Sequence, residues 1–137
     1  MKVIRKNGRM AEAGAPLGGA FVGVVSQLPL LVYDTEQLAE LIFVEFDSDA
    51  HTHWHTHDAG QVLLLVEGQG AVVTESESVR LNVGDCVVAA PGERHWHGSA
   101  PETGGGAVFL AASLGGEEWF DAPVLLDGSS ESGESGA

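Results

Sequence analysis

The segment His51-Thr-His53-Trp-His55-Thr-His57-Asp-Ala-Gly-Gln61-Val-Leu-Leu-Leu-Val-Glu-Gly68 decides the fold, because a histidine-bearing strand is joined here to an apolar one by a short turn. Four of the six histidines in the chain lie in this segment, each two residues from the next. Alternate residues of a strand face the same side. We therefore expect the four imidazoles to project together, with the residues between them on the opposite face.

A second segment carries the remaining histidines at the same spacing: Gly84-Asp-Cys-Val-Val-Ala-Ala-Pro-Gly-Glu-Arg-His95-Trp-His97. Imidazole is the commonest metal ligand in proteins, and two on one strand can reach a single ion. A surface histidine cluster would explain one such run. Two runs, each beside turn residues at a strand end, favour a metal site.

The rest of the chain consists of short apolar runs separated by turn residues, and no 3.6-residue period is sustained for a normal helix length. This pattern predicts an all-β fold, either an antiparallel sandwich or a closed barrel. A chain of 137 residues fits one domain. We expect a flexible segment at 1–15, a barrel at 16–126 and a disordered acidic tail at 127–137. Strands are expected at 21–25, 30–33, 38–46, 62–66, 71–74, 78–81, 86–90 and 106–112.

Charge narrows the possible partners. Twenty acidic residues against six Lys and Arg give a formal net charge of −14, which disfavours binding to nucleic acid or to anionic membranes. No apolar stretch approaches the ~18 residues needed to cross a bilayer, so we expect a soluble, cytoplasmic protein. Cys86 is the single cysteine, and its apolar surroundings predict a buried strand residue.

The two histidine segments, in this order and about 25 residues apart, resemble the two motifs of the cupin family. The first motif has His-x-His, then an acidic residue, then glycine; the second has a Gly-Asp turn, a strand and Pro-x-Gly-x-x-His. The resemblance implies a cupin jelly-roll β-barrel (a double-stranded β-helix), often a homodimer, with one divalent metal ion inside one end. The ligands carried over from the family are His55, His57, Gln61 and His95.

Three positions depart from the family pattern: Asp49 stands where glycine is usual, Ala90 replaces the first proline of the second motif, and Gln61 replaces the acidic ligand. The last departure changes the chemistry. Three imidazoles and an amide leave the full charge on a divalent ion, which strengthens it as a Lewis acid. An amide cannot take up a proton, so an enzyme of this kind needs another proton carrier.

His53 and His97 are the candidates for that carrier, since strand alternation places each on the same face as a ligand. They could equally orient ligands or water. His51 is expected at the barrel rim, exposed to solvent. Arg94 is expected in a salt bridge.

The pocket beside the metal is expected to be apolar, which suits a small and partly apolar substrate. Trp54 and Trp96 are expected to point away from the metal. The expected lining residues are Phe43, Leu63, Leu65, Val88 and Phe109.

Within the cupins, residues 54–61 and 91–98 resemble small bacterial members that include manganese-dependent hydroxynitrile lyases, in which glutamine is the usual fourth ligand. The likeness runs from about residue 21 to residue 119. Those lyases also carry an active-site histidine on a late strand, and residues 106–111 contain none.

The resemblance implies a lyase acting on a small organic molecule. The alternatives are an Fe²⁺ dioxygenase, a polyketide cyclase or isomerase, and a non-catalytic cupin that binds a small ligand. Mn²⁺ or Fe²⁺ is favoured, and the ligand set also accommodates Zn²⁺, Ni²⁺ or Co²⁺.

Overall fold

The computed structural model describes residues 1, 3–5, 11–12, 20–32, 39–101 and 104–125. The tail expected at 127–137 lies outside the described residues, as does most of segment 1–15. Within these ranges the chain is nearly all strand and contains no α-helix. The prediction of an all-β fold is confirmed. No helix in the described part of the chain has the length and apolar character needed to cross a membrane.

Thirteen strands follow one another along the described chain. They are β1 (Ala11–Glu12), β2 (Phe21–Val22), β3 (Val25–Val32), β4 (Ala39–Phe46), β5 (His51–Thr52), β6 (His55–His57), β7 (Gln61–Gly68), β8 (Gly70–Thr74), β9 (Ser78–Leu81), β10 (Cys86–Ala89), β11 (His95–Ser99), β12 (Ala107–Leu114) and β13 (Glu117–Trp119). Each of the eight ranges expected from the apolar runs overlaps one of these strands, range 21–25 spans the bend between β2 and β3, and residues 33 and 38 lie outside the described residues. The apolar pattern did not predict β13, which contains two glutamates.

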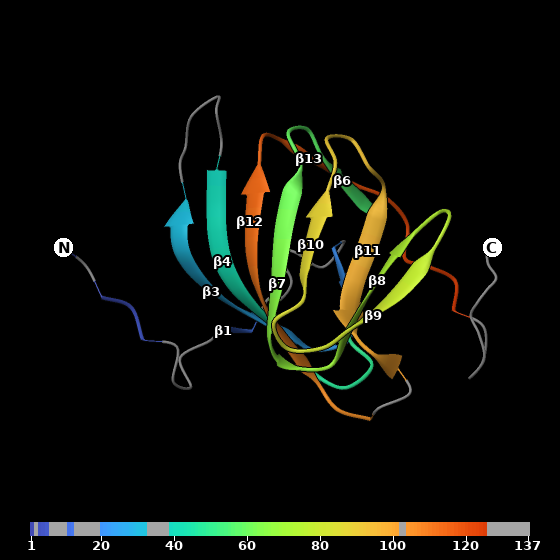
Figure 1. Ribbon diagram of the computed structural model, residues 1–137, viewed down its shortest axis with the longest axis horizontal. Helices are drawn as coiled ribbons and strands as arrows, with labels where there is room; N and C mark the ends of the chain where they lie inside the picture. The colour runs from blue at the N-terminus through green and yellow to red at the C-terminus, as the bar shows by residue number, and fades with distance from the viewer. Residues whose placement is uncertain (2, 6–10, 13–19, 33–38, 102–103, 126–137) are drawn as a thin grey trace.

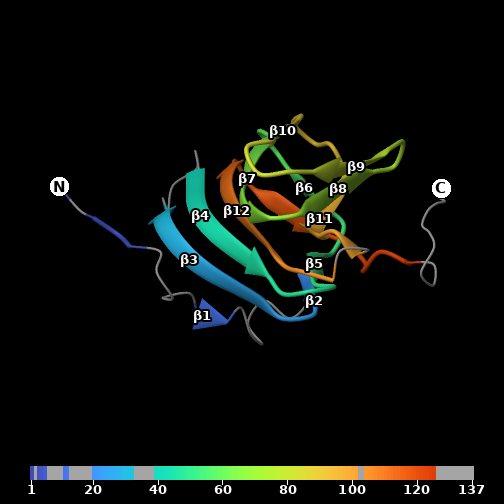
Figure 2. The same cartoon turned by 60° about the horizontal axis from the view of Figure 1, so that its bottom comes forward.

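The strands form two antiparallel sheets that curl toward each other around the core (Figures 1 and 2). One sheet has the order β1-β3-β4-β12-β7-β10. The other has the order β13-β6-β11-β5-β2, and β8 pairs with β11 and with β9. In both sheets some neighbours come from distant parts of the chain, such as β12 beside β4 and β11 beside β6, which is the jelly-roll arrangement expected from the sequence. The two histidine strands, β6 and β11, lie side by side in the second sheet.

Alternate residues of β4, β7 and β12 fill the space between the sheets. Phe46, Leu63, Leu65 and Phe109 are completely buried. The rings of Phe46 and Phe109 meet edge to face with centroids 5.8 Å apart. Each buried side chain of this size contributes roughly 1.5–3 kcal/mol of transfer free energy to folding. This core closes one end of the barrel behind the histidines.

Three predictions of burial need correction. Cys86 is exposed rather than buried. Val88 on the same strand is 74% exposed and does not line the interior. Strand β10 pairs only with β7 and forms the edge of its sheet, so apolar composition there does not mean burial. Phe43 lies on the outer face of β4, because Ile42, Val44 and Phe46 take the inner one.

Asp49 has a φ of 67°, in the left-handed region that glycine adopts most easily. The family's usual glycine at this position therefore has a backbone reason, and aspartate is among the residues that tolerate this conformation. The turn leads from β4 into the first histidine strand.

Candidate metal centre

Four histidines converge inside the barrel from two neighbouring strands. His95 of β11 pairs directly with His55 of β6, and His57 and His97 follow at alternate positions. All four side chains are buried. The ring centroids of His55 and His95 are 4.3 Å apart, and those of His55 and His97 are 5.5 Å apart. Strand alternation within each run therefore brings together the imidazoles that the sequence analysis singled out.

Gln61 reaches the same point from the start of β7. Its Nε2 donates to Ser113 Oγ at 2.9 Å, which turns the amide oxygen toward the histidines. Oε1 then lies 2.8 Å from His95 Nε2. The predicted fourth ligand is thus at the cluster, held by a serine on β12.

The protonation state of these rings shows which nitrogen atoms are free to bind a cation. His55 Nδ1 donates to the carbonyl of His53 at 2.9 Å, and His95 Nδ1 donates to the carbonyl of Glu93 at 3.0 Å. A neutral imidazole has one N–H, so Nε2 of both rings carries a lone pair. His95 Nε2 and Gln61 Oε1 are therefore two acceptors facing each other. A cation between them satisfies both atoms, and the residues fit a divalent metal ion.

The surroundings keep all four imidazoles neutral. Burial, followed by repulsion from His95, lowers the pKa of His55 to about 3 and that of His57 to about 4. Burial also lowers the pKa of His95, and that of the completely buried His97 falls well below its usual value. Neutral rings at pH 7 offer the lone pairs that a metal ion needs.

His57 and His97 occupy different positions around the cluster. The nitrogen atoms of His55, His95 and His97 that could bind a metal all lie within 4.8 Å of one another. Within the described residues, both ring nitrogens of His57 and Nδ1 of His97 are buried without a hydrogen-bond partner. His97 is packed between Phe46 and Phe109, at centroid distances of 5.5 and 5.2 Å. The structure therefore brings the predicted proton carrier His97 as close to the centre as the predicted ligands.

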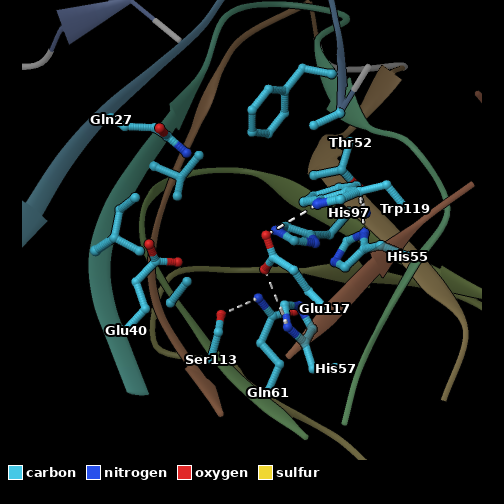
Figure 3. Close-up of a pocket in the computed structure, with 15 residues that line it drawn as sticks. Gln27, Glu40, Thr52, His55, His57, Gln61, His97, Ser113, Glu117 and Trp119 are labelled. Carbon is cyan, nitrogen blue, oxygen red and sulfur yellow. Dashed lines mark hydrogen bonds and ion pairs between the residues drawn. The ribbon is translucent and has the colours of Figure 1, made fainter. Parts of the chain in front are cut away.

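The cluster faces a cavity of about 110 Å³ (Figure 3). The residues expected from the sequence do not form its apolar lining, which consists of Ala20, Phe21, Ile42, Val44 and Ala111. Of the expected residues, Leu63, Leu65 and Phe109 are buried in the core behind the cavity. The polar lining residues that sequence reasoning missed are Gln27, Glu40, Thr52, Ser113 and Glu117, with Trp119 beside them.

Among the described lining residues, Glu40 and Glu117 are the two acidic ones, and they interact electrostatically with each other. Burial, followed by the charge of Glu117, raises the pKa of Glu40. Among the described lining residues there is no Lys or Arg. The cavity thus combines neutral imidazoles with two carboxylates, Glu117 beside His57 and Glu40 on the opposite sheet.

His53 and His51 do not follow the expected alternation. The histidine run is divided into β5 and β6, and His53 lies in the interruption, where its Nδ1 contacts the carbonyl of Phe120 at 3.2 Å. His53 is absent from the cavity lining. His51 is 5% exposed and packs against Trp96, so the expectation of a solvated rim position was wrong. Because the strand is interrupted between β5 and β6, alternation from His55 no longer predicts which face His51 and His53 occupy.

The flanking residues behave as expected. Arg94 forms a salt bridge with Glu75 at 3.3 Å on the surface. Its guanidinium also lies 4.8 Å from the ring of Trp54 and 4.9 Å from the ring of Phe120. Neither Trp54 nor Trp96 lines the cavity.

The chain is similar to known proteins in both sequence and fold. A family model described as a cupin domain matches residues 42–112. The (R)-mandelonitrile lyase of Granulicella tundricola is 34% identical over 121 residues, which cover 86% of this chain and 92% of that protein. A solved cupin-like protein from Thermotoga maritima superposes with a TM-score of 0.72 at 27% identity, covering 88% of this chain and 90% of that one. An acetylacetone dioxygenase from Acinetobacter johnsonii also reaches a TM-score of 0.72, but at 14% identity, covering 88% and 78% of the chains, and it shows the shared fold alone.

Proposed function

The chain belongs to the cupin family, and we propose that it is a metal-dependent lyase that cleaves or forms a small cyanohydrin. The ligands of the single divalent ion in this proposal are His55, His57, Gln61 and His95. The observation that carries it is the 2.8 Å approach of two acceptors, Gln61 Oε1 and His95 Nε2, at a cavity. The substrate class is supported by the 34% identity with a mandelonitrile lyase over most of both chains.

The neutral ligand set suits this chemistry. When bound, a divalent ion would keep its full charge and supply Lewis acidity toward a substrate oxygen or cyanide. Mn²⁺ or Fe²⁺ is the preferred ion in this proposal, as expected for a nitrogen and oxygen ligand set with open positions.

His97 is the proposed proton carrier. Its buried, neutral ring has an unpartnered Nδ1 beside the cavity. In the cleavage direction, this ring takes the proton of the substrate hydroxyl as the carbon–carbon bond to the nitrile breaks. The products are an aldehyde and cyanide, and the same proton passes to cyanide to release HCN. His53 has no comparable position, since its ring lies outside the cavity lining.

The opposite wall sets the character of the substrate. Ile42, Val44 and Ala111 provide an apolar surface for an aromatic or alkyl group. Glu40 on this wall and Glu117 beside His57 disfavour a carboxylate substrate by charge repulsion and leave neutral molecules as the preferred class.

Oxygen chemistry is the second candidate. The three-histidine cluster of His55, His95 and His97 favours it, since three-histidine sites in cupins can also hold Fe²⁺ for a dioxygenase. A cyclase or isomerase and a non-catalytic binder are the further alternatives, and each of them predicts metal binding without cyanohydrin turnover.

The test is turnover with and without oxygen. Protein purified without chelator is analysed for metal, loaded with Mn²⁺ or Fe²⁺, and incubated with (R)-mandelonitrile under anaerobic conditions and in air. We expect benzaldehyde to form at the same rate in both, and to need the metal. His53→Ala is the matched control and should retain the rate. Turnover that requires oxygen would identify a dioxygenase, and metal binding without any turnover would overturn the lyase.

A further inference from the structure

Strand β13 lies directly on the ligand strand β6. Three cross-strand pairs place Glu117 opposite His57 and Trp119 opposite His55. The chain reaches this position through a tight turn in which Gly115 has a φ of 77°. A Cβ at Gly115 would lie 3.0 Å from the backbone nitrogen of Ala59, so the turn requires glycine both for its backbone and for its close approach.

The three histidines proposed as ligands differ in what their Nδ1 atoms contact. Those of His55 and His95 donate to the backbone carbonyl two residues earlier in the chain. His57 makes no such bond, and the group that approaches its Nδ1 is Oε1 of Glu117, at 3.7 Å. Two of the rings are thus oriented by the backbone of their own strand, and the third is approached by a side chain from another strand.

Glu117 is itself held in place. Its Oε2 accepts a hydrogen bond from Trp119 Nε1 at 3.1 Å, and Oε1 is left facing His57 (Figure 3). The ring of Trp119 packs against the imidazole of His55 with centroids 4.4 Å apart. One tryptophan therefore contacts one ligand ring and fixes the carboxylate that faces another.

We propose that Glu117 is a positioning residue of the metal centre, which accepts the Nδ1 proton of His57 and so keeps Nε2 of that ring as the ligand atom. A small turn of His57 toward a bound ion would bring the 3.7 Å approach within hydrogen-bond distance. A carboxylate behind a ligand histidine fixes its tautomer and increases its basicity. Here it also adds a negative charge beside a ligand set that has none. The inference rests on the metal site of the proposed function and not on its lyase activity.

Metal affinity of the full chain tests the proposal. We expect Glu117→Ala to weaken Mn²⁺ binding 10- to 100-fold, the range found for such outer partners of metal ligands. Glu117→Gln keeps an acceptor oxygen without the charge and should fall between Glu117→Ala and the wild type. Trp119→Phe keeps a ring against His55 and loses the bond to Glu117, so a smaller loss is expected. Glu118→Gln is the matched control, because its exposed side chain lies on the same strand opposite Thr56.

A second readout separates positioning from a general structural role. In Zn²⁺-loaded protein labelled with ¹⁵N, the imidazole nitrogens of His57 should show Nδ1 protonated in the wild type, and this signature should weaken in Glu117→Ala. Wild-type affinity in Glu117→Ala, or an equal loss in Glu118→Gln, would overturn the proposal. Absence of cyanohydrin turnover would count against the proposed function and would leave the affinity result unchanged.

Discussion

The strands on either side of β6, namely β11 and β13, serve the same site in different ways. Strand β11 supplies His95 and His97, which point into the cluster. Strand β13 supplies Glu117 and Trp119, which approach the rings of β6 from behind and from the side. One neighbour provides groups that can bind the ion, and the other provides groups that hold those already present.

The two strands differ in how many contacts are needed to place their side chains. On β11, strand alternation alone directs both imidazoles inward, and the Nδ1 of His95 needs only a carbonyl from its own strand. On β13, the role of Glu117 depends on three cross-strand pairs and on the indole of Trp119. We therefore expect changes on β11 to abolish function and changes on β13 to tune it.

The largest effect is expected from the histidines of β11, which also separate ligand from proton carrier. His95→Ala should weaken Mn²⁺ binding at least ~100-fold, because it removes a ligand outright. His97→Ala should keep the metal and lose about 10²- to 10⁴-fold in turnover, the usual contribution of a positioned proton carrier. Metal content after dialysis and anaerobic mandelonitrile cleavage measure the two effects. If His97→Ala loses the metal and His57→Ala keeps it, the ligand set is His55, His95 and His97, and Glu117 positions no ligand.

The second effect is the pH dependence of stability, which reports on the two buried histidines of β6. The pKa of His55 is lowered to about 3 and that of His57 to about 4, whereas unfolded histidine titrates near pH 6.5. Below pH 6.5 the unfolded chain therefore binds protons that the folded chain does not. Stability is present above pH 6.5 and is lost as the pH falls toward 4.

Urea unfolding of the chelator-treated protein at a series of pH values measures this loss. Each neutral buried histidine contributes up to about 1.4 kcal/mol per pH unit, so a fall of roughly 3–5 kcal/mol between pH 6.5 and pH 4.5 is expected. Saturating Mn²⁺ should steepen the dependence, because protons compete with the metal for the same lone pairs. A free energy of unfolding that stays constant over this range would show that the rings are solvated and not buried around a site.

The sequence was sufficient to predict the residues of β11 and β6, because their signal is local. Histidines two residues apart on a strand share a face wherever the strand lies in the fold, and His55, His57 and His95 do so. The same reasoning failed for His51 and His53, since a break between β5 and β6 cannot be seen from spacing alone.

Glu117 could not be predicted because its role arises from pairing over long sequence separation. It lies 60 residues after its partner His57, in a strand with no apolar alternation. The Gly115-Gly116 pair that precedes it is a turn signal, and it does not indicate which strand pairs with the residues that follow. Cys86 and Val88 are the opposite case. Their apolar sequence context predicted burial, but they lie on an edge strand and are exposed.

The smallest effect is expected from Glu40, which lies on the sheet opposite β13 and interacts with the charge of Glu117. Burial, followed by the charge of Glu117, raises the pKa of this half-buried carboxyl. A raised pKa means that the folded chain holds the proton more tightly than the unfolded chain, so the stability that this group provides is lost as the pH rises. Glu40→Gln should therefore increase the free energy of unfolding by less than about 1 kcal/mol at pH 8, and by less still at pH 4. Urea unfolding measures the difference, with the exposed Glu45→Gln of the same strand as control. Destabilisation by Glu40→Gln at pH 8 would mean that a cation compensates the two carboxylates, and Glu40 would then belong to the metal centre together with Glu117.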